Sequence, residues 1–263
     1  MKNYRTYTYL LFLNIIFFLA PLTSAHSLKD AINSEDRSPK NVARDQYRNP
    51  YETLSFFEIK KDMKVAELSP GGGWYTEILA NYIHSPGMLV AAHFDKNSGR
   101  DFYIRMRNNF ENKINENPMY KNVSIVDLSS KLADRETLDA VLTFRNLHNW
   151  IGPQIDIILS NAHNALKKGG VLGVVEHRAD PGTSLEEMKK TGYVTEAYAI
   201  ETAKKNGFTL ISKSEINANP KDTKNYPRGV WTLPPVLRLK EQDKEKYLNI
   251  GESDRMTLLF KKL

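Results

Sequence analysis

Three consecutive glycines at 71–73 follow the short apolar run Met63–Leu68 and precede an amphipathic segment. This order predicts a buried strand, a tight turn and a helix. Glycine leaves the backbone of the turn uncovered, and the first amides of the helix are unpaired donors at the positive end of its dipole. Such a turn can bind a polar ligand through main-chain amides, while the carboxylate of Glu67 can accept hydrogen bonds from a cationic amine or a hydroxyl.

A dinucleotide-binding turn of the form G-x-G-x-x-G needs a glycine three residues after its second one. Counted from Gly73, that position holds Thr76. An acid is also expected about 20 residues further along the chain to bind a ribose hydroxyl, and Asp95 lies somewhat beyond that distance. The spacing therefore favours S-adenosylmethionine over a nicotinamide cofactor, and a nicotinamide-dependent reductase remains an alternative.

A second group of polar side chains follows the apolar run Leu138–Phe144, which predicts a strand. It consists of Arg145, Asn146, His148 and Trp150. His148 can act as a base at neutral pH, and Trp150 can stack on a planar or cationic group. The alternative for His148 is a hydrogen-bonded structural histidine, which is common after a strand.

Predicted strands and helices alternate along the rest of the chain. Strands are expected at 63–68, 88–94, 123–126, 138–144, 171–176, 208–216 and 256–261, and helices at 51–57, 74–83, 102–110, 155–166 and 194–205. This alternation predicts a mostly parallel α/β sheet with helices on both faces, whose ligands bind at the carboxyl ends of the strands. Those ends carry four polar residues, namely Glu67, Asp95, Asp127 and Arg145.

Two further features adjoin the fifth predicted strand. The helix at 155–166 is expected to close with the basic turn 167–170, whose glycines stop it. His177 follows the strand, next to Glu176, and is a weaker candidate than His148 for the base.

The composition is that of an ordinary globular protein. Of 263 residues, 41% are hydrophobic and 26% are charged, which suffices for one well-packed α/β domain. The formal net charge is +6, but basic and acidic residues are mixed along the chain, so nucleic acid is not an expected partner. Cysteine is absent, so the mature chain must rely on its core for stability.

The N-terminus has the features of an export signal. Lys2 and Arg5 precede an apolar stretch at 9–22, and small residues lead to a cleavage site after Ala25. The stretch is shorter than the ~20 residues of a transmembrane helix, so no stable membrane anchor is expected after cleavage. We therefore expect a signal peptide at 1–25 and a periplasmic or secreted protein.

The mature chain is expected to consist of a helical extension at 26–57 and one domain at 58–263. A Pro-rich insertion at about 217–255 interrupts this domain, and its first part contains Tyr226 and Trp231. The length of this insertion favours a lid or substrate wall over the sheet edge. The alternative is a rigid surface connection in which Trp231 fills a small satellite core.

Several segments resemble class I S-adenosylmethionine-dependent methyltransferases. VAELSPGGGWYTEIL is similar to their first motif, DAVLTFRNLHNW to the fourth-strand motif, and LKKGGVLGVVEHR to the segment that leads into strand five. Together with GYVTEAYAIETAKKNGF and NPKDTKNYPRGVWTLPP, they resemble a bacterial family of exported predicted methyltransferases of unassigned substrate. The similarity begins near Ser38. It implies a seven-stranded Rossmann-like sheet with helices on both faces and the last strand antiparallel between the fifth and sixth.

The resemblance assigns the cofactor side of the site. Glu67 takes the place of the acid that holds the methionine amino end, directly or through water. Ser69, Gly71 and Gly73 occupy the three places of the usual glycine pattern, and Gly72 lies between them. Ser69 departs from that pattern, and serine is tolerable there when its φ is negative.

The resemblance also assigns the adenosine and methyl ends. Asp95 resembles the ribose-binding acid after the second strand, although His93 competes for that alignment. Asp127 is expected near the adenine amine. Phe144 and Arg145 follow the fourth strand, where the methyl donor and the acceptor meet.

The implied activity is S-adenosylmethionine-dependent methyl transfer to an unidentified small acceptor, with Arg145 and His148 as catalytic residues and no metal. Catalysis of this kind places a nucleophile in line with an activated methyl group and removes a proton. The alternative is an exported, non-catalytic binding protein that uses the same glycine turn for a nucleoside-like or polar small molecule. That alternative arises because the cofactor is made in the cytosol, whereas the leader predicts export. The sequence indicates no oligomeric state.

Overall fold

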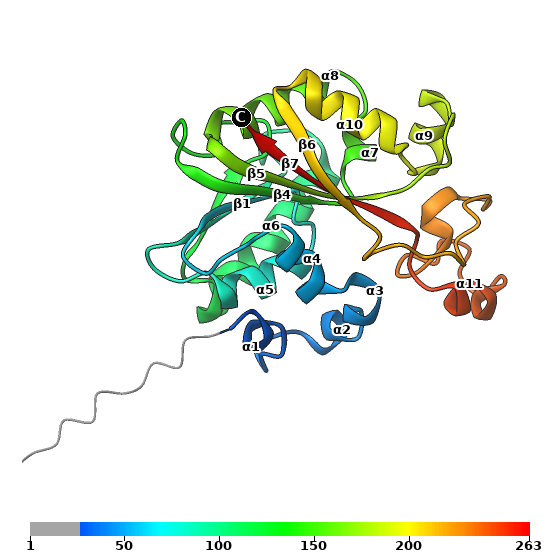
Figure 1. The fold of residues 1–263 in the computed structure, drawn as a ribbon. Coiled ribbons are helices and arrows are strands. Elements are labelled where there is room, and N and C mark those ends of the chain that lie inside the picture. Colours follow the sequence, from blue (N-terminus) through cyan, green and yellow to red (C-terminus); the bar gives the residue numbers. More distant parts are fainter. Residues whose placement is uncertain (1–26) are drawn as a thin grey trace, which may run out of the picture.

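Seven strands form one mixed sheet in the order β3-β2-β1-β4-β5-β7-β6 (Figure 1). The strands are β1 Lys64–Leu68, β2 Met88–His93, β3 Val123–Asp127, β4 Leu138–Phe144, β5 Leu166–His177, β6 Phe208–Ser214 and β7 Arg255–Lys262. The first five strands are parallel, and β7 lies antiparallel between β5 and β6. The predicted sheet and the predicted place of its last strand are therefore confirmed.

This computed structural model describes residues 27–263. The predicted signal peptide at 1–25 lies outside the described residues. Among residues 27–263, no helix is long and apolar enough to cross a membrane.

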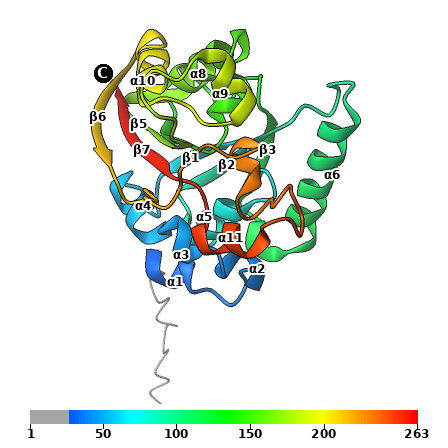
Figure 2. The same ribbon diagram turned by 90° about the vertical axis from the view of Figure 1, so that its right-hand side faces the viewer.

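Helices cover both faces of the sheet (Figures 1 and 2). One face carries α7, α8, α9 and α10, and the other carries α1, α4, α5 and α6. The helices are α1 Leu28–Ile32, α2 Pro39–Val42, α3 Asp45–Arg48, α4 Pro50–Phe56, α5 Trp74–Tyr82, α6 Asp101–Glu116, α7 Leu147–Trp150, α8 Pro153–Ala165, α9 Leu185–Thr191, α10 Glu196–Lys205 and α11 Lys244–Ile250, with 3-10 turns η1 Pro118–Tyr120 and η2 Gly229–Thr232.

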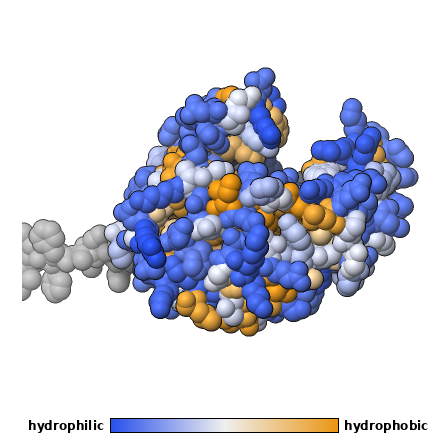
Figure 3. Space-filling view, turned by 90° about the horizontal axis from the view of Figure 1, so that it is seen from above, coloured by the Kyte–Doolittle hydropathy of each residue, from blue (hydrophilic) through white to orange (hydrophobic). Residues whose placement is uncertain are grey.

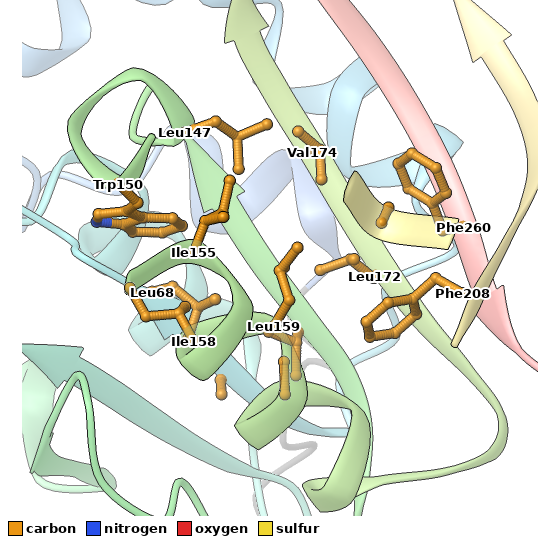
Figure 4. Close-up of a cluster of buried hydrophobic side chains, with 14 of the residues drawn as sticks. Leu68, Leu147, Trp150, Ile155, Ile158, Leu159, Leu172, Val174, Phe208 and Phe260 are labelled. Carbon is orange, nitrogen blue, oxygen red and sulfur yellow. The ribbon is translucent and has the colours of Figure 1, made fainter. Parts of the chain in front are cut away.

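The core consists of two apolar layers, one on each face. Successive side chains of a strand point to opposite faces, so Val65 of β1 joins the layer under α5, while Ala66 and Leu68 join the layer under α8. Figure 4 shows the second layer, in which Ile158 and Leu159 of α8 pack against the sheet. Burial on both faces explains why the strands read as continuous apolar runs in the sequence.

The boundary between α8 and β5 differs from the prediction. Helix α8 ends at Ala165, and the turn at 167–170 belongs to β5, so the predicted helical close at 167–170 is wrong. The reason is that Leu166 pairs with Leu138 of β4, and the register then shifts as in a β-bulge. Gly169, with a φ of +76°, allows that bulge.

Two segments distant in sequence meet beyond the carboxyl ends of the strands. The amide nitrogen Nδ2 of Asn49, after α3, donates to the carbonyl of Ile216 at 2.7 Å. The side chain of Asn217 donates to Oγ1 of Thr53 in α4 at 3.0 Å. The N-terminal extension and the Pro-rich insertion are thus tied together. Seen from above, the molecular surface is mostly hydrophilic and shows a notch between two protruding lobes (Figure 3).

Candidate functional site

The glycine turn between β1 and α5 exposes bare backbone. Gly71 and Gly73 have φ values of +59° and +79°, which glycine adopts without a steric penalty. A Cβ atom built at Gly71 or Gly72 would meet nothing within 4 Å, whereas one at Gly73 would lie 3.1 Å from the ring of Phe110. Since Gly73 directly precedes the first residue of α5, the first amides of that helix adjoin a stretch of main chain that a ligand can approach.

Ser69 does not meet the condition under which serine is tolerable at its position. Its φ is +49° rather than negative, a conformation that favours glycine. Its amide donates to the carbonyl of Ala92 at 2.8 Å, so the pairing with β2 continues one residue past β1. The chain therefore changes direction at Ser69. Asn146 supports this reversal, because its Nδ2 lies 3.1 Å from the carbonyl oxygen of Leu68 and 3.2 Å from that of Ser69. Asn146 therefore holds the turn in place.

His93 lies under the glycine turn. The amide of Phe94 donates to His93 Nδ1 at 2.8 Å, so the ring proton is on Nε2, which lies 3.2 Å from the carbonyl oxygen of Gly71. The ring is 1% exposed and stacks on Phe110 with 4.8 Å between centroids. Burial lowers the pKa of His93 to about 4, which keeps the ring neutral. Both ring nitrogens of His93 are therefore engaged within the chain.

Glu67 lies behind the turn and is 2% exposed. Its Oε2 accepts a hydrogen bond from Oγ1 of Thr76 at 2.6 Å. Burial raises the pKa of Glu67 to about 7, against the opposing effects of the Thr76 hydrogen bond and the charges of Lys113 and Arg145. Thr76, which stands where a nicotinamide-binding turn would have its third glycine, is therefore the hydrogen-bond donor to Glu67.

The two acids expected beside the adenosine are also hydrogen-bonded within the chain. An oxygen of Asp95 accepts from the amide of Asn97 at 2.7 Å. Asp127 pairs with Arg107 at 2.7 Å, and the same guanidinium nitrogen donates to the carbonyl of Phe94. Arg107 therefore fixes the ends of β2 and β3 relative to each other.

One cavity of about 420 Å³ joins the glycine turn to the ends of β4 and β5. It brings together six of the predicted site residues, namely Ser69, Gly71, Gly72, Phe144, Arg145 and His148. Glu67, Gly73, Asp95 and Asp127 are not among its lining residues. The remaining walls come from the N-terminal extension, from the glycine turn and the start of α5, from the ends of β4 and β5, and from the Pro-rich insertion. They consist of Lys40, Asn41, Arg44, Arg48, Pro70, Trp74, Asn146, Asn149, His177, Val230, Trp231, Pro234, Pro235, Val236, Glu252 and Ser253.

Aromatic side chains connect the turn to the N-terminal extension. Trp74 donates its Nε1 proton to the carbonyl of Asn41 at 2.8 Å, and the guanidinium of Arg48 lies 4.6 Å from the Trp74 ring. Tyr75 stacks on Phe144 with 3.5 Å between centroids and 11° between ring planes. The contacts of Trp74 hold α2 and α3 over the first turn of α5, and the stack of Tyr75 on Phe144 joins the same turn to β4.

His148 is held by a buried carboxylate. Its Nδ1 lies 3.1 Å from Oε1 of Glu176, and its backbone amide lies 3.3 Å from Oε2 of the same side chain. Glu176 is 0% exposed, so a proton on Nδ1 of His148 satisfies an otherwise costly buried charge. That arrangement leaves Nε2 with the lone pair, which is what a general base needs. Sequence analysis did not identify Glu176 as its partner.

His148, Glu176 and His177 are also close enough to ligate a metal, with ligand atoms within 4.8 Å of one another in the part of the chain that the structure describes. However, both oxygens of Glu176 already accept backbone N–H groups, from His148 and from His177 at 2.7 Å. His177 Nδ1 lies 2.5 Å from Oγ of Ser253, and burial lowers the pKa of His177 well below its usual value. The hydrogen bonds therefore suit the orientation of His148 better than metal ligation.

Arg145 and Trp150, predicted in the same cluster, diverge in the structure. Arg145 lines the cavity, and burial lowers its pKa to about 10. Trp150 is 3% exposed and lies in the core layer under α8 (Figure 4), so the prediction that it stacks on a ligand is wrong. Trp231 instead lines the cavity, 5.9 Å from the ring of His148, and also packs against the small cluster of Ala179, Tyr193 and Val230. Trp231 therefore both forms part of the cavity wall and packs in a small satellite core.

No protein-family model matches the sequence, and no curated protein matches it. Solved structures are similar in fold. A SAM dependent methyltransferase from Aquifex aeolicus has a TM-score of 0.57 at 15% identity, over 90% of this chain and 99% of that one. Geranyl diphosphate C-methyltransferase from Streptomyces coelicolor, in complex with Mg2+, geranyl diphosphate and S-adenosyl-L-homocysteine, has a TM-score of 0.57 at 12% identity over 89% of each chain.

A third similar structure is the [4+2]-cyclase SpnF, with a TM-score of 0.60 at 12% identity over 89% of this chain and 92% of that one. The chain therefore has the class I methyltransferase fold. Because a cyclase shares that fold, the reaction must be argued from the site.

The raised pKa of Glu67 predicts a pH-dependent stability. The unfolded chain ionises Glu67 near its ordinary pKa while the folded chain holds the proton up to about pH 7, so this residue's contribution to stability falls as pH rises through that window. Between pH 5 and pH 8, the free energy of unfolding of the wild type should fall by ~3 kcal/mol relative to that of Glu67→Gln, which has no carboxyl group to ionise at this position. Urea denaturation at both pH values measures this, with exposed Glu186→Gln as the control. Parallel pH profiles for wild type and Glu67→Gln would contradict it.

Proposed function

We propose that this chain is an S-adenosylmethionine-dependent methyltransferase that acts on a small acceptor, with His148 as the general base. The proposal is carried by one observation: a single cavity contains both the uncovered glycine turn and the ring of a histidine oriented by a buried glutamate. The similar folds of methyltransferases support it.

The residues of the turn fit the proposed cofactor. The open positions at Gly71 and Gly72 and the first amides of α5 would bind its polar groups through the main chain. Glu67 would attract its amino group from behind the turn, and Asp95 would bind its ribose. When bound, S-adenosylmethionine supplies a methyl group that is already activated on a sulfonium.

The chain's own chemistry is then positioning and proton removal. Arg145 and His148 flank the acceptor end of the cavity, beyond β4. Nε2 of His148 takes the proton that the acceptor loses when its nucleophilic atom is methylated, and Glu176 stabilises the imidazolium that forms. A positioned base of this kind contributes about 10²–10⁴-fold to the rate.

A non-catalytic binding protein is the second candidate, and the predicted export signal favours it because the cofactor is made in the cytosol. Such a protein would need the glycine turn but would have no use for a paired His148 and Glu176. The paired residues therefore favour the enzyme.

Cofactor binding can be tested at Gly72, where a side chain fits the free protein but obstructs a ligand. By calorimetry, the chain from residue 26 onward should bind S-adenosylmethionine and S-adenosylhomocysteine, and NADH should not bind. Gly72→Leu should weaken both affinities at least tenfold with an unchanged Tm, whereas Glu186→Leu on α9 should change neither. Failure of all three compounds to bind would end the proposal.

The role of His148 can be tested by transfer of a tritiated methyl group from S-adenosylmethionine to the small molecules of a cell extract. His148→Asn and Glu176→Gln should each lower the rate at least 100-fold, because the first removes the base and the second its orientation. The Kd for S-adenosylmethionine should stay within twofold in both variants. An unchanged transfer rate in His148→Asn would exclude it as the base.

We also propose that the chain is exported and cleaved after Ala25. Fractionated cells should then contain a protein that begins at His26 outside the cytoplasm, as N-terminal sequencing would show. Replacing the apolar stretch at 9–22 with polar residues should retain the full-length chain inside. A full-length cytosolic wild-type product would contradict export and would also remove the conflict with the cofactor's origin.

A further inference from the structure

Four arginines surround one buried carboxylate at the acceptor end of the cavity. Nε of Arg44 lies 2.7 Å from Oε1 of Glu252, and Nε of Arg48 lies 3.2 Å from Oε2. Nη1 of Arg145 and Nη1 of Arg255 lie 3.4 Å and 3.3 Å from the same Oε2. These residues come from the N-terminal extension, from the end of β4 and from the start of β7, and we call them the arginine cluster.

The arginine cluster carries more positive charge than its carboxylate can balance. Four guanidinium groups and one carboxylate sum to +4 − 1 = +3. The nearby acid Asp254 is itself paired with Arg178 and Lys224. Burying like charges together is costly unless an opposite charge joins them. The cluster therefore has the electrostatics of an anion site.

One of these cations is buried with an unused donor. The side chain of Arg48 is 2% exposed, and its Nη1 has no hydrogen-bond partner. Buried polar groups are normally satisfied, so an unpartnered guanidinium nitrogen in a cavity wall indicates a missing acceptor. The side chains of Arg44 and Arg145, 24% and 21% exposed, line the same cavity, as does Lys40.

We propose that the methyl acceptor is an anion, and that Arg44, Arg48 and Arg145 bind its carboxylate or phosphate group. The guanidinium fork matches both groups in a bidentate geometry. The arginine cluster lies with His148 and His177 beyond β4 and β5, whereas the glycine turn follows β1, so an anion bound here places the acceptor beside the base. This assignment rests on the proposed function and adds the chemical class of its substrate.

The cofactor also carries a carboxylate, so the test must separate the two sources of negative charge. Pyrophosphate serves as the acceptor probe, and its binding to the chain from residue 26 onward is measured by calorimetry with and without S-adenosylhomocysteine. Decarboxylated S-adenosylmethionine serves as the cofactor probe. Arg44→Gln and Arg145→Gln are the test variants, and Arg105→Gln on the exposed face of α6 is the matched control. Circular dichroism confirms that each variant is folded.

We expect wild type and Arg105→Gln to bind pyrophosphate, and Arg44→Gln to bind it at least tenfold more weakly with its S-adenosylhomocysteine affinity unchanged. Arg145→Gln should behave like Arg44→Gln. The inference is overturned if wild type does not bind pyrophosphate. It is also overturned if Arg44→Gln weakens the binding of S-adenosylmethionine tenfold but leaves the binding of decarboxylated S-adenosylmethionine unchanged. The arginine cluster would then bind the carboxylate of the cofactor. Pyrophosphate binding without any S-adenosylhomocysteine binding would keep the anion site and reject the proposed function alone.

Discussion

The carboxylate of Glu252 is the contact on which the arginine-lined end of the cavity depends. It lies within hydrogen-bond or ion-pair distance of Arg44, Arg48, Arg145 and Arg255, which come from three segments distant from one another in sequence. Without this negative charge, the like charges of the N-terminal extension and of the sheet edge would repel one another, and removing one partner of a buried ion pair costs ~3–5 kcal/mol. One acid holds the arginine cluster together, and the cluster has a net positive charge because that acid is outnumbered.

The glycine turn is held in place before any ligand arrives. His93 contacts the carbonyl of Gly71 from below, Lys113 donates to the carbonyl of Gly72 at 2.9 Å, and Asn146 donates to the carbonyls before the turn. Fixing the carbonyls in this way directs the neighbouring amides, because each peptide unit is planar. A ligand therefore meets donors that need no ordering, and preorganisation of this kind raises affinity by reducing the entropy lost on binding.

The sequence predicts the fold well because strand burial, helix periodicity and glycine turns are local signals that agree with one another. The antiparallel last strand came from the family resemblance. The sequence predicts the site only in part. Trp150 points into the core because α7 is a single turn whose orientation depends on packing, and Ser69 takes a positive φ because β2 and Asn146 hold both sides of it. The role of Arg48 depends on Glu252, 204 residues later, and no local pattern encodes such a contact.

The ionisable groups of the site are divided between its two ends. The acid behind the glycine turn, Glu67, lies at the end of β1, while the arginine cluster lies beyond β4 and at the start of β7. Under the proposed function, the anionic acceptor would be attracted to the arginine cluster, and the amino group of the cofactor would favour the ionised form of Glu67, whose pKa is about 7 without a ligand. The amino group that Glu67 would bind keeps its charge when a methyl group is transferred, so Glu67 would hold the cofactor and its product alike. The choice of acceptor would then fall to the arginine cluster at the other end of the cavity.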